Sequence, residues 1–413
     1  MMKRYRRTAA SQYLVVFIVL LSIIGVGLLS ALVMSRIPFA DEFALPWAAG
    51  RLWLLSGESP YAPSAIQDAT LAMDESTFLA SLPDSQVLRH PLLTMVFYLP
   101  FSLMPYAAAR VIWMTILAIC VGLIGFFGIQ LSGWKGSAFE QFGAILLIVI
   151  WLPGASAILA GNLAPITIVL LLAGTYLVVN GQDTTAGMLL SLTFSAFPSS
   201  GLILIVLLIW AISQRRWSLL SGYFSGVIFL LVISWLVMPS WFMEWAAVMF
   251  ETYQGWEWIN TPMMSLAALL PGITSPFSIF LHGALIFYSI TLTITILGQS
   301  GRSFFYKLFT VFIIAYLLHV QPSIFLLLLM IPAMFLVFRS WSERWGLFGN
   351  LLSWGVLVLI VVGSWLLVYS TIDFTQPDYG PFLTIGYPLL VLLGMIWIRW
   401  WALRIPKLPY ETQ

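Results

Sequence analysis

Long apolar runs separated by short polar turns recur along the whole chain. A helix needs about 20 apolar residues to cross the hydrocarbon core of a bilayer. The pattern predicts twelve membrane-spanning segments, at 12–35, 107–131, 143–160, 164–180, 184–197, 199–213, 217–238, 277–299, 303–319, 321–338, 350–371 and 382–402. We therefore expect an all-α polytopic membrane protein, with residues 1–413 forming one integral membrane domain.

The composition supports a body embedded in lipid. Of the 413 residues, 61% are hydrophobic and only 8% are charged, and the mean hydropathy is +0.98. A water-soluble domain does not need so much apolar surface, whereas a bundle of lipid-facing helices does. The net charge of +2 gives no basis for binding nucleic acid, and the single cysteine, Cys120, excludes a disulfide framework and a cysteine metal site.

The N-terminus, MMKRYRRTAASQYLVVFIVLLSIIGVGLLSALVMS, begins with basic residues as a signal peptide does. Its apolar run is about twice as long as a signal-peptide core, and no small-residue cleavage motif follows it. We expect an uncleaved first span.

Basic residues near span ends indicate which side of the membrane is cytoplasmic. With both termini inside the cell, every one of the 18 lysines and arginines falls on the cytoplasmic side except Arg36, Arg51, Arg89 and Arg110. Most acidic residues fall on the opposite side, in the segments 36–106, 239–276 and 372–381. These segments are expected to be extracytoplasmic and to form the active face of a multi-pass plasma membrane protein.

Two alternative span counts distribute the basic residues less well. Segment 91–104 could be a crossing, or 184–213 could be one long helix instead of two. Either choice inverts the downstream topology and leaves far fewer basic residues inside. Segment 91–104, which contains Pro100 and is followed by Pro105, is therefore expected to be re-entrant or interfacial.

The outer segments carry patterns of helices that lie on a membrane surface. Phe43, Trp47, Gly50 and Leu54 recur at one face of a helix, and the stretch WFMEWAAVMFETYQGWEWINTP has a similar aromatic and acidic character. Trp47, Trp256 and Trp258 could stack on a sugar ring, although interfacial anchoring is the commoner role of such tryptophans.

Two helical hairpins are predicted to open toward the outer face. Segments 184–197 and 199–213 are too short to cross the core, so the apex at 197–201 should lie below the outer surface, beside protein or a cavity. Ser199 and Ser200 could cap a helix start there, which would favour an anion. A second bend, with Gly161 and Asn162, joins 143–160 to 164–180. An ordinary hairpin turn is the alternative at each place.

The stretch FADEFALPWAAGRLWLLSGESPY sets Asp41 beside Glu42 near the membrane edge. Adjacent carboxylates repel, which tends to raise the pKa of one of them toward the working range of a general base. The alternative is a solvated helix start, where negative charge favours the helix dipole.

The order of motifs over about residues 12–340 resembles glycosyltransferase family 87. The motifs are the acid–Phe pair, WAAGR, SGESPY, a residue before Pro91, PFSLMP, GNLAP and a short hairpin with proline at its apex. The resemblance implies a GT-C-like helical bundle that transfers a hexose, mannose or similar, from a polyprenyl-phosphate sugar to a lipid or glycan acceptor. It implies no metal and no cofactor beyond the lipid-linked donor. The family's acid–Phe pair corresponds to Glu42 and Phe43, so Asp41 or Glu42 is expected to be the catalytic base.

The chain departs from the family pattern at the hairpin apex. Where family members often have Lys-Pro, with the lysine neutralising the donor phosphate, this chain has Phe197-Pro198. The family's Gly-Gln appears as Gly161-Asn162, its Tyr-Pro as His90-Pro91, and its late motif as His319-Val320-Gln321-Pro322. The residues expected to bind donor phosphate or substrate are Arg51, Arg89, His90, Gly161, Asn162, Pro198, Ser199, Ser200 and His319.

A different class of function stays open. All three histidines, His90, His282 and His319, fall toward the outer face, but no HExxH or DxD metal motif occurs. A transporter or a non-catalytic lipid- or glycan-binding membrane protein would also use broken helices. The absence of an internal repeat and of charge at the span centres favours chemistry at the interface.

Overall fold

The computed structural model describes residues 39–82, 88–252, 261–268, 270, 272–320, 323–369 and 382–401, together with 25, 27, 28 and 31–36. The protein is 81% helical, which confirms the all-α class. Within those residues the only sheet is a parallel bridge between β1 (Phe39–Ala40) and β2 (Ala80–Ser81).

Among the described residues, five helices are long and apolar enough to cross a membrane. They are α5 (Tyr106–Ser132), α11 (Trp217–Val237), α14 (Thr274–Ile296), α17 (Leu347–Tyr369) and the continuous pair of η3 (Ile324–Met330) and α16 (Ile331–Trp345). The bent pair of α6 (Ala138–Ile150) and α7 (Leu152–Ala160) makes a sixth if it counts as one span. The predicted count of twelve is not confirmed. Other predicted spans correspond to the shorter helices α8 (Ala164–Val179), α9 (Asp183–Ser191), α10 (Phe197–Ser213), α15 (Gly301–Leu317) and α18 (Tyr387–Trp401). The π-helical turn η4 (Phe382–Gly386) directly precedes α18. Most of 12–35 and all of 372–381 lie outside the described residues.

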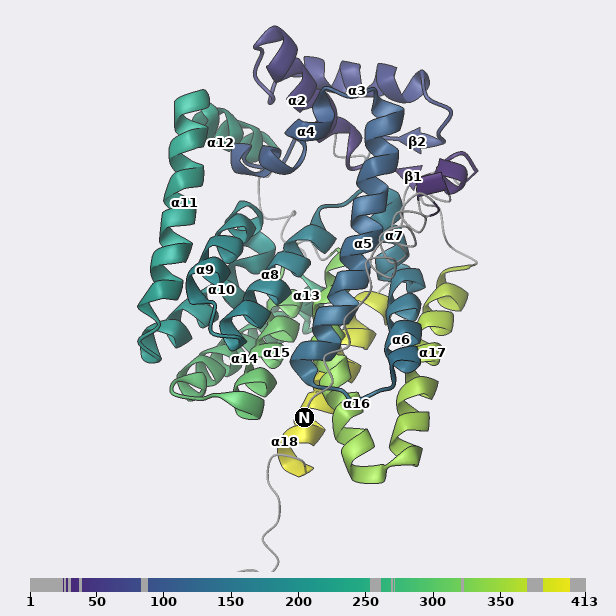
Figure 1. Ribbon diagram of the computed structural model, residues 1–413, viewed down its shortest axis with the longest axis vertical. Helices are drawn as coiled ribbons and strands as arrows, with labels where there is room; N and C mark the ends of the chain where they lie inside the picture. The colour runs from purple at the N-terminus through teal and green to yellow at the C-terminus, as the bar shows by residue number, and fades with distance from the viewer. Residues whose placement is uncertain are drawn as a thin grey trace, which may run out of the picture.

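The helices divide into a central group and a periphery. In the η3–α16 pair 89% of the most apolar stretch is buried within the protein, compared with 17% in α14. Apolar helices that are covered by so little protein are stable only where lipid surrounds them. Figure 1 shows two of the less buried helices, α11 and α17, on opposite sides of the molecule.

The sequence pattern predicted one span over 143–160, but the helix is broken there. α6 and α7 meet at an angle of 55° around Trp151. Pro153, in the first turn of α7, has no N–H to continue the hydrogen-bond ladder of α6. The indole N–H of Trp365 donates to the carbonyl of Ile150 at 2.8 Å, so that the break satisfies one of the acceptors it frees.

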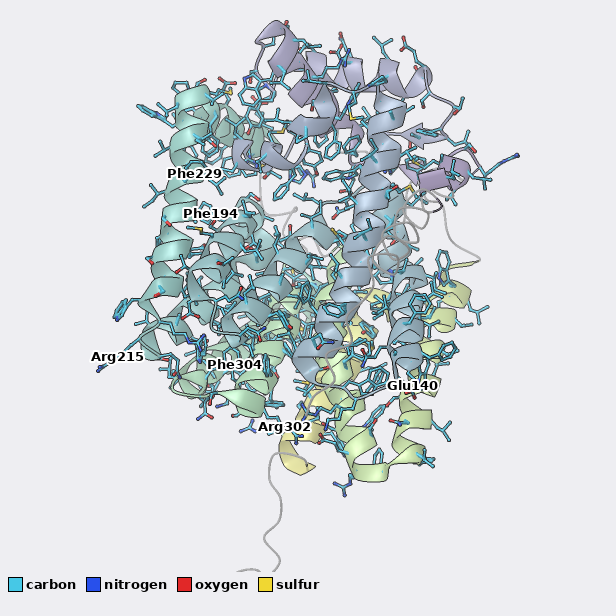
Figure 2. The ribbon with its side chains drawn as sticks, in the orientation of Figure 1. Glu140, Phe194, Arg215, Phe229, Arg302 and Phe304 are labelled. Carbon is cyan, nitrogen blue, oxygen red and sulfur yellow. The ribbon has the colours of Figure 1, made fainter. Side chains whose placement is uncertain are left out.

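The predicted short hairpin at 184–213 is confirmed. α9 continues into the 3₁₀ turn η2 (Leu192–Ala196), and α10 returns. Arg216 pairs with Asp183 at 3.0 Å where α10 ends and α9 begins, so the turn lies at the other end of the hairpin. There the hydroxyl of Thr94 donates to the carbonyl of Ser195 at 3.2 Å. Phe194 of η2 lies between the two ends of the molecule in Figure 2, so the turn reaches neither end.

Short helices form a layer over the N-terminal end of α5 (Figure 1). The layer contains α2 (Ala44–Ser56), α3 (Ser64–Asp74), η1 (Leu92–Phe97) and α4 (Leu99–Ser102). The helix predicted in this segment is present as α2, in which Trp47 is buried and Leu54 is 46% exposed. η1 and α4 are too short to cross a membrane, as expected for 91–104.

Segment 239–276 adds α12 (Trp241–Thr252) and α13 (Pro262–Ala267). The Ser59 hydroxyl donates to the Glu244 carboxylate of α12, and the Trp245 indole donates to the Arg89 carbonyl at 3.1 Å. α12 is thereby tied to the outer layer. Trp256 and Trp258 lie outside the described residues.

The contact between α9 and α11 depends on Gly187. A Cβ at this position would lie 2.2 Å from the carbonyl oxygen of Leu219. We expect Gly187→Ala to force the helices apart and to lower the thermal unfolding midpoint in detergent, at a cost of about 1–3 kcal/mol. Gly283→Ala in α14 is the control, because a Cβ there would meet nothing within 4 Å. Equal midpoints for the two variants would contradict the close packing of α9 on α11.

Candidate active site

Asp41 lies at the centre of a fully buried cluster. Its Oδ1 accepts the N–H of Phe43 at 2.8 Å. Its Oδ2 accepts Nε of Arg110 at 2.9 Å and the hydroxyl of Tyr106. The side chains of Asp41 and Arg110 are both 0% exposed. With three donors around it and no access to solvent, this carboxylate is suited to holding the structure together.

Arg110 connects three parts of the chain. It comes from the first turn of α5, it also donates to the carbonyl of Leu159 in α7, and its guanidinium lies 5.2 Å from the centre of the Phe39 ring. The same cation therefore fixes β1, α5 and the end of α7 relative to one another. Its Nη1 has no hydrogen-bond partner among the described residues.

Glu42 is docked on the corner between α7 and α8. Its N–H donates to the carbonyl of Ala160 at 2.8 Å, and its Oε2 accepts the side-chain amide of Asn162 at 2.5 Å. The amide oxygen of Asn162 accepts the N–H of Ala164 at 2.7 Å, at the start of α8. Asn162 thus caps a helix and orients the acid at once.

Gly161 allows this close docking. Its φ of +73° is left-handed, and a Cβ on it would lie 3.0 Å from Cβ of Phe43 and 3.2 Å from Cζ of Arg110. Its carbonyl accepts the indole N–H of Trp113 at 2.8 Å. Any larger residue would be strained in its backbone and would crowd Phe43 and Arg110.

The environment of Glu42 raises its pKa to about 7. Burial is the main cause, because a carboxylate removed from water is less stable than the neutral acid. The hydrogen bond from Asn162 opposes the rise in pKa, the charge of Asp41 adds to it, and the charge of Arg89 opposes it. Unlike Asp41, Glu42 is only partly buried. It can exchange a proton near neutral pH, as a general base must.

His90 follows Arg89 in the same outer layer. Burial and the neighbouring charge of Arg89 lower the pKa of His90 to about 4, so its imidazole is neutral at neutral pH. Its ring lies 6.0 Å from that of Tyr98, and its carbonyl accepts the hydroxyl of Tyr61 at 3.2 Å. A neutral imidazole can donate or accept a hydrogen bond to a substrate oxygen but brings no charge.

The other residues predicted for the site lie elsewhere or serve the fold. The prediction that Ser200 caps a helix start is wrong, because its hydroxyl donates to the carbonyl of Thr193 at 2.8 Å and α10 has no side-chain cap. Pro198 and Ser199 form the first turn of α10, and their side chains are outside the described set. Arg51 lines a separate cleft over the Trp47 ring.

The three histidines do not form one group among the described contacts. His282 is held by the Thr261 hydroxyl at 2.8 Å and the Ser278 carbonyl at 2.7 Å, between α13 and α14. His319 follows α15, where its N–H donates to the Tyr316 carbonyl at 3.0 Å. No three His, Cys, Asp or Glu side chains of the described residues come together as a metal would require.

Neither Arg110 nor Tyr106 was predicted from the sequence as a site residue. The feature that could have indicated them is Arg110 itself, the one charged residue within the apolar run 107–131. An ionisable residue in such a run needs a buried partner. Which acid supplies it depends on how α5 packs against the β1 segment, and that is a property of the fold.

The comparison with protein families identifies this helical membrane protein. The model of glycosyltransferase family 87 matches residues 89–298, just over half of the chain of 413 residues. The chain belongs to glycosyltransferase family 87. No curated protein and no solved structure matches it. The matched residues include Arg89, His90, Arg110 and the Gly161–Asn162 corner, whereas Asp41 and Glu42 precede them.

The two acids are expected to respond differently to neutralisation. Asp41→Asn leaves Arg110 charged and buried without its counter-ion, so the free energy of unfolding should fall by about 3–5 kcal/mol. Glu42→Gln keeps a group that can accept from Asn162 and removes a carboxylate whose ionisation burial disfavours, so its unfolding midpoint should not fall. Thermal unfolding of both variants in one detergent checks this. A loss as large in Glu42→Gln as in Asp41→Asn would contradict the division of roles.

Proposed function

We propose that this protein transfers a hexose, mannose or similar, from a polyprenyl-phosphate sugar to a lipid or glycan acceptor at the extracytoplasmic face of the plasma membrane. The observation that carries the proposal is Glu42, a partly buried carboxylate with a pKa near 7 that Asn162 holds on the Gly161 corner. Family membership supplies the reaction class, glycosyl transfer by a membrane protein.

The proposed reaction is a displacement at the anomeric carbon. Glu42 takes the proton of the acceptor hydroxyl as its oxygen bonds to the anomeric carbon of the donor. The bond from that carbon to the phosphate oxygen breaks, and the electron pair leaves with the polyprenyl phosphate. Asp41 is a positioning residue here, because Arg110, Tyr106 and the Phe43 N–H occupy its oxygens.

Arg89 is the proposed cation for the donor phosphate, in place of the lysine that is missing at the hairpin apex. Its charge acts on Glu42, and the next residue, His90, is neutral at working pH. A guanidinium can bind two phosphate oxygens at once. A neutral His90 can then hydrogen-bond a phosphate oxygen without competing for charge.

The distribution of charge supports the proposed orientation. The α2–α4 layer is at the end of the molecule where α5 begins (Figure 1), while Arg215 and Arg302 lie toward the other end (Figure 2). Glu42 shortly precedes α2 and Arg89 shortly precedes η1, so both belong to this layer. Basic residues near span ends favour the cytoplasmic side. The layer of short helices would then face outward, where lipid-linked sugars would reach it within the membrane interface.

Loss of the base tests the function directly. Purified protein in lipid nanodiscs, given radiolabelled polyprenyl-phosphate hexoses and a lipid acceptor, should transfer label. Glu42→Gln should lower kcat by about 10²–10⁴. Glu251→Gln on α12 is the matched control and should keep wild-type activity, because Glu251 is exposed and is not among the groups acting on Glu42. No transfer across a donor panel of mannosyl, glucosyl and galactosyl lipids would favour a binding or transport role.

The pH dependence of transfer should report the ionisation of Glu42. Only the carboxylate can act as a base, so the rate should rise with pH with a midpoint near 7. Asn162→Ala removes a hydrogen bond that favours the ionised form, so the midpoint should move to higher pH. Asn180→Ala at the far end of α8 is the control, since that amide donates only to the Tyr176 carbonyl in the described structure. A midpoint unmoved by Asn162→Ala would argue against Glu42 as the titrating group.

A further inference from the structure

A cleft of about 520 Å³ lies between α2, α3 and the turn that enters α5. This volume is typical of small-molecule sites, which span about 300–1,000 Å³. The acid pair is not part of its wall. The cleft is therefore a site of its own in the layer of short helices, distinct from the Glu42 corner.

One wall of the cleft is a single face of α3 and its C-terminal turn. Asp68, Leu71, Ala72 and Glu75 follow one another at i, i+3, i+4 and i+7, and all of them line the cleft. This spacing puts four side chains in one stripe along a helix. Two carboxylates are thus presented to the same space about two turns apart.

The facing wall is aromatic and cationic. The rings of Trp47 and Tyr106 meet edge to face with centres 5.5 Å apart, and the Arg51 guanidinium lies 5.6 Å from the centre of Trp47. The Trp47 indole donates to the carbonyls of Phe101 at 3.0 Å and Met104 at 3.3 Å, which fixes the ring. Both rings are only 4% exposed and stiffen this wall, while the exposed apolar surface of the cleft comes from Leu71 and Leu103.

The charges of the cleft select the kind of ligand. Among the described side chains no ion pair joins Arg51 to Asp68 or Glu75, so these groups face the cleft without neutralising one another. Two carboxylates and one guanidinium make the lining net negative. A phosphate would be repelled, whereas a neutral polyol can donate to the carboxylates and accept from the guanidinium.

The cleft and the acid pair share one residue. The Tyr106 ring lines the cleft, and its hydroxyl donates to Asp41 in the buried cluster. A molecule in the cleft therefore lies against Tyr106, the residue whose hydroxyl holds Asp41 next to Glu42.

We propose that this cleft binds a neutral saccharide, namely the sugar portion of the acceptor, and that Arg51 contacts this sugar instead of the donor phosphate. The assignment to the acceptor rests on the proposed glycosyl transfer, whereas sugar binding by the cleft does not. The apolar face of the sugar packs on Leu71 and Leu103, and its hydroxyls bond to Arg51, Asp68 and Glu75. The part of the acceptor that carries the reacting hydroxyl extends beyond the cleft to Glu42, where the donor binds beside Arg89.

Sugar binding by the purified full-length protein tests the cleft without any transfer assay. Saturation-transfer-difference NMR in detergent would use disaccharides of mannose, glucose and N-acetylglucosamine, with mannose 1-phosphate as the anionic probe. At least one neutral disaccharide should bind. Asp68→Ala and Arg51→Gln should each weaken it about tenfold or more, as expected when a hydrogen bond to a charged group is lost. Asp74→Ala is the matched control, because this exposed carboxylate on α3 does not line the cleft.

The outcomes separate this inference from the proposed function. In transfer assays Asp68→Ala should raise KM for the acceptor and leave KM for the donor and kcat near their wild-type values. Sugar binding that survives in Asp68→Ala and Arg51→Gln, binding of mannose 1-phosphate in preference to every neutral sugar, or no binding of any disaccharide would each overturn the cleft assignment. An inactive protein that still binds a disaccharide through Asp68 would overturn the transfer reaction and leave the cleft a glycan-binding site.

Discussion

The outer half of this protein depends on a buried ion pair between Asp41 and Arg110, joined at 2.9 Å with neither side chain exposed. An uncompensated charge at that depth would cost several kcal/mol. β1, α5 and α7 therefore cannot separate without leaving one of the two buried charges unpaired. The Gly161 corner packs directly on the pair, with room for no side chain of its own. The position of Glu42 follows from this arrangement, since its N–H and its carboxylate are both bound by that corner.

Two adjacent carboxylates therefore have different physical roles. Asp41, which follows β1, faces inward, where Arg110, Tyr106 and a backbone N–H saturate it, and Glu42, in the turn after it, faces the partly open corner. The inner charge then adds to the burial that raises the pKa of the outer acid, while Asn162 limits the rise. Charge at the first position fixes the geometry, and proton exchange is left to the second. The same layer of short helices carries the cleft around Arg51, which shares Tyr106 with the buried Asp41 cluster.

The sequence was informative wherever short-range pattern decides structure. It predicted the helical class, the helix at α2, the non-spanning piece at 91–104 and the short hairpin that ends in α10, because these follow from apolar periodicity, proline and segment length. It missed the break at Trp151, since Pro153 reads equally well as the start of a helix or as a kink. It could not pair Asp41 with Arg110, which are 69 residues apart. It also could not distinguish which of the two adjacent acids would be buried. It also assigned Ser200 to a cap, although the hydroxyl has a nearer acceptor in the Thr193 carbonyl.

The central claim is that Glu42 titrates near neutrality within the folded protein. Infrared difference spectroscopy of the protein in nanodiscs, with ¹³C-labelled glutamate, follows the carboxyl band of that class of residue as pH changes. The labelled band of the protonated Glu42 carboxyl should disappear as pH rises, with a midpoint near pH 7, and should be absent in Glu42→Gln. A spectrum in which Glu42→Gln removes only a band titrating below about pH 5, the range of a solvated glutamate, would contradict it.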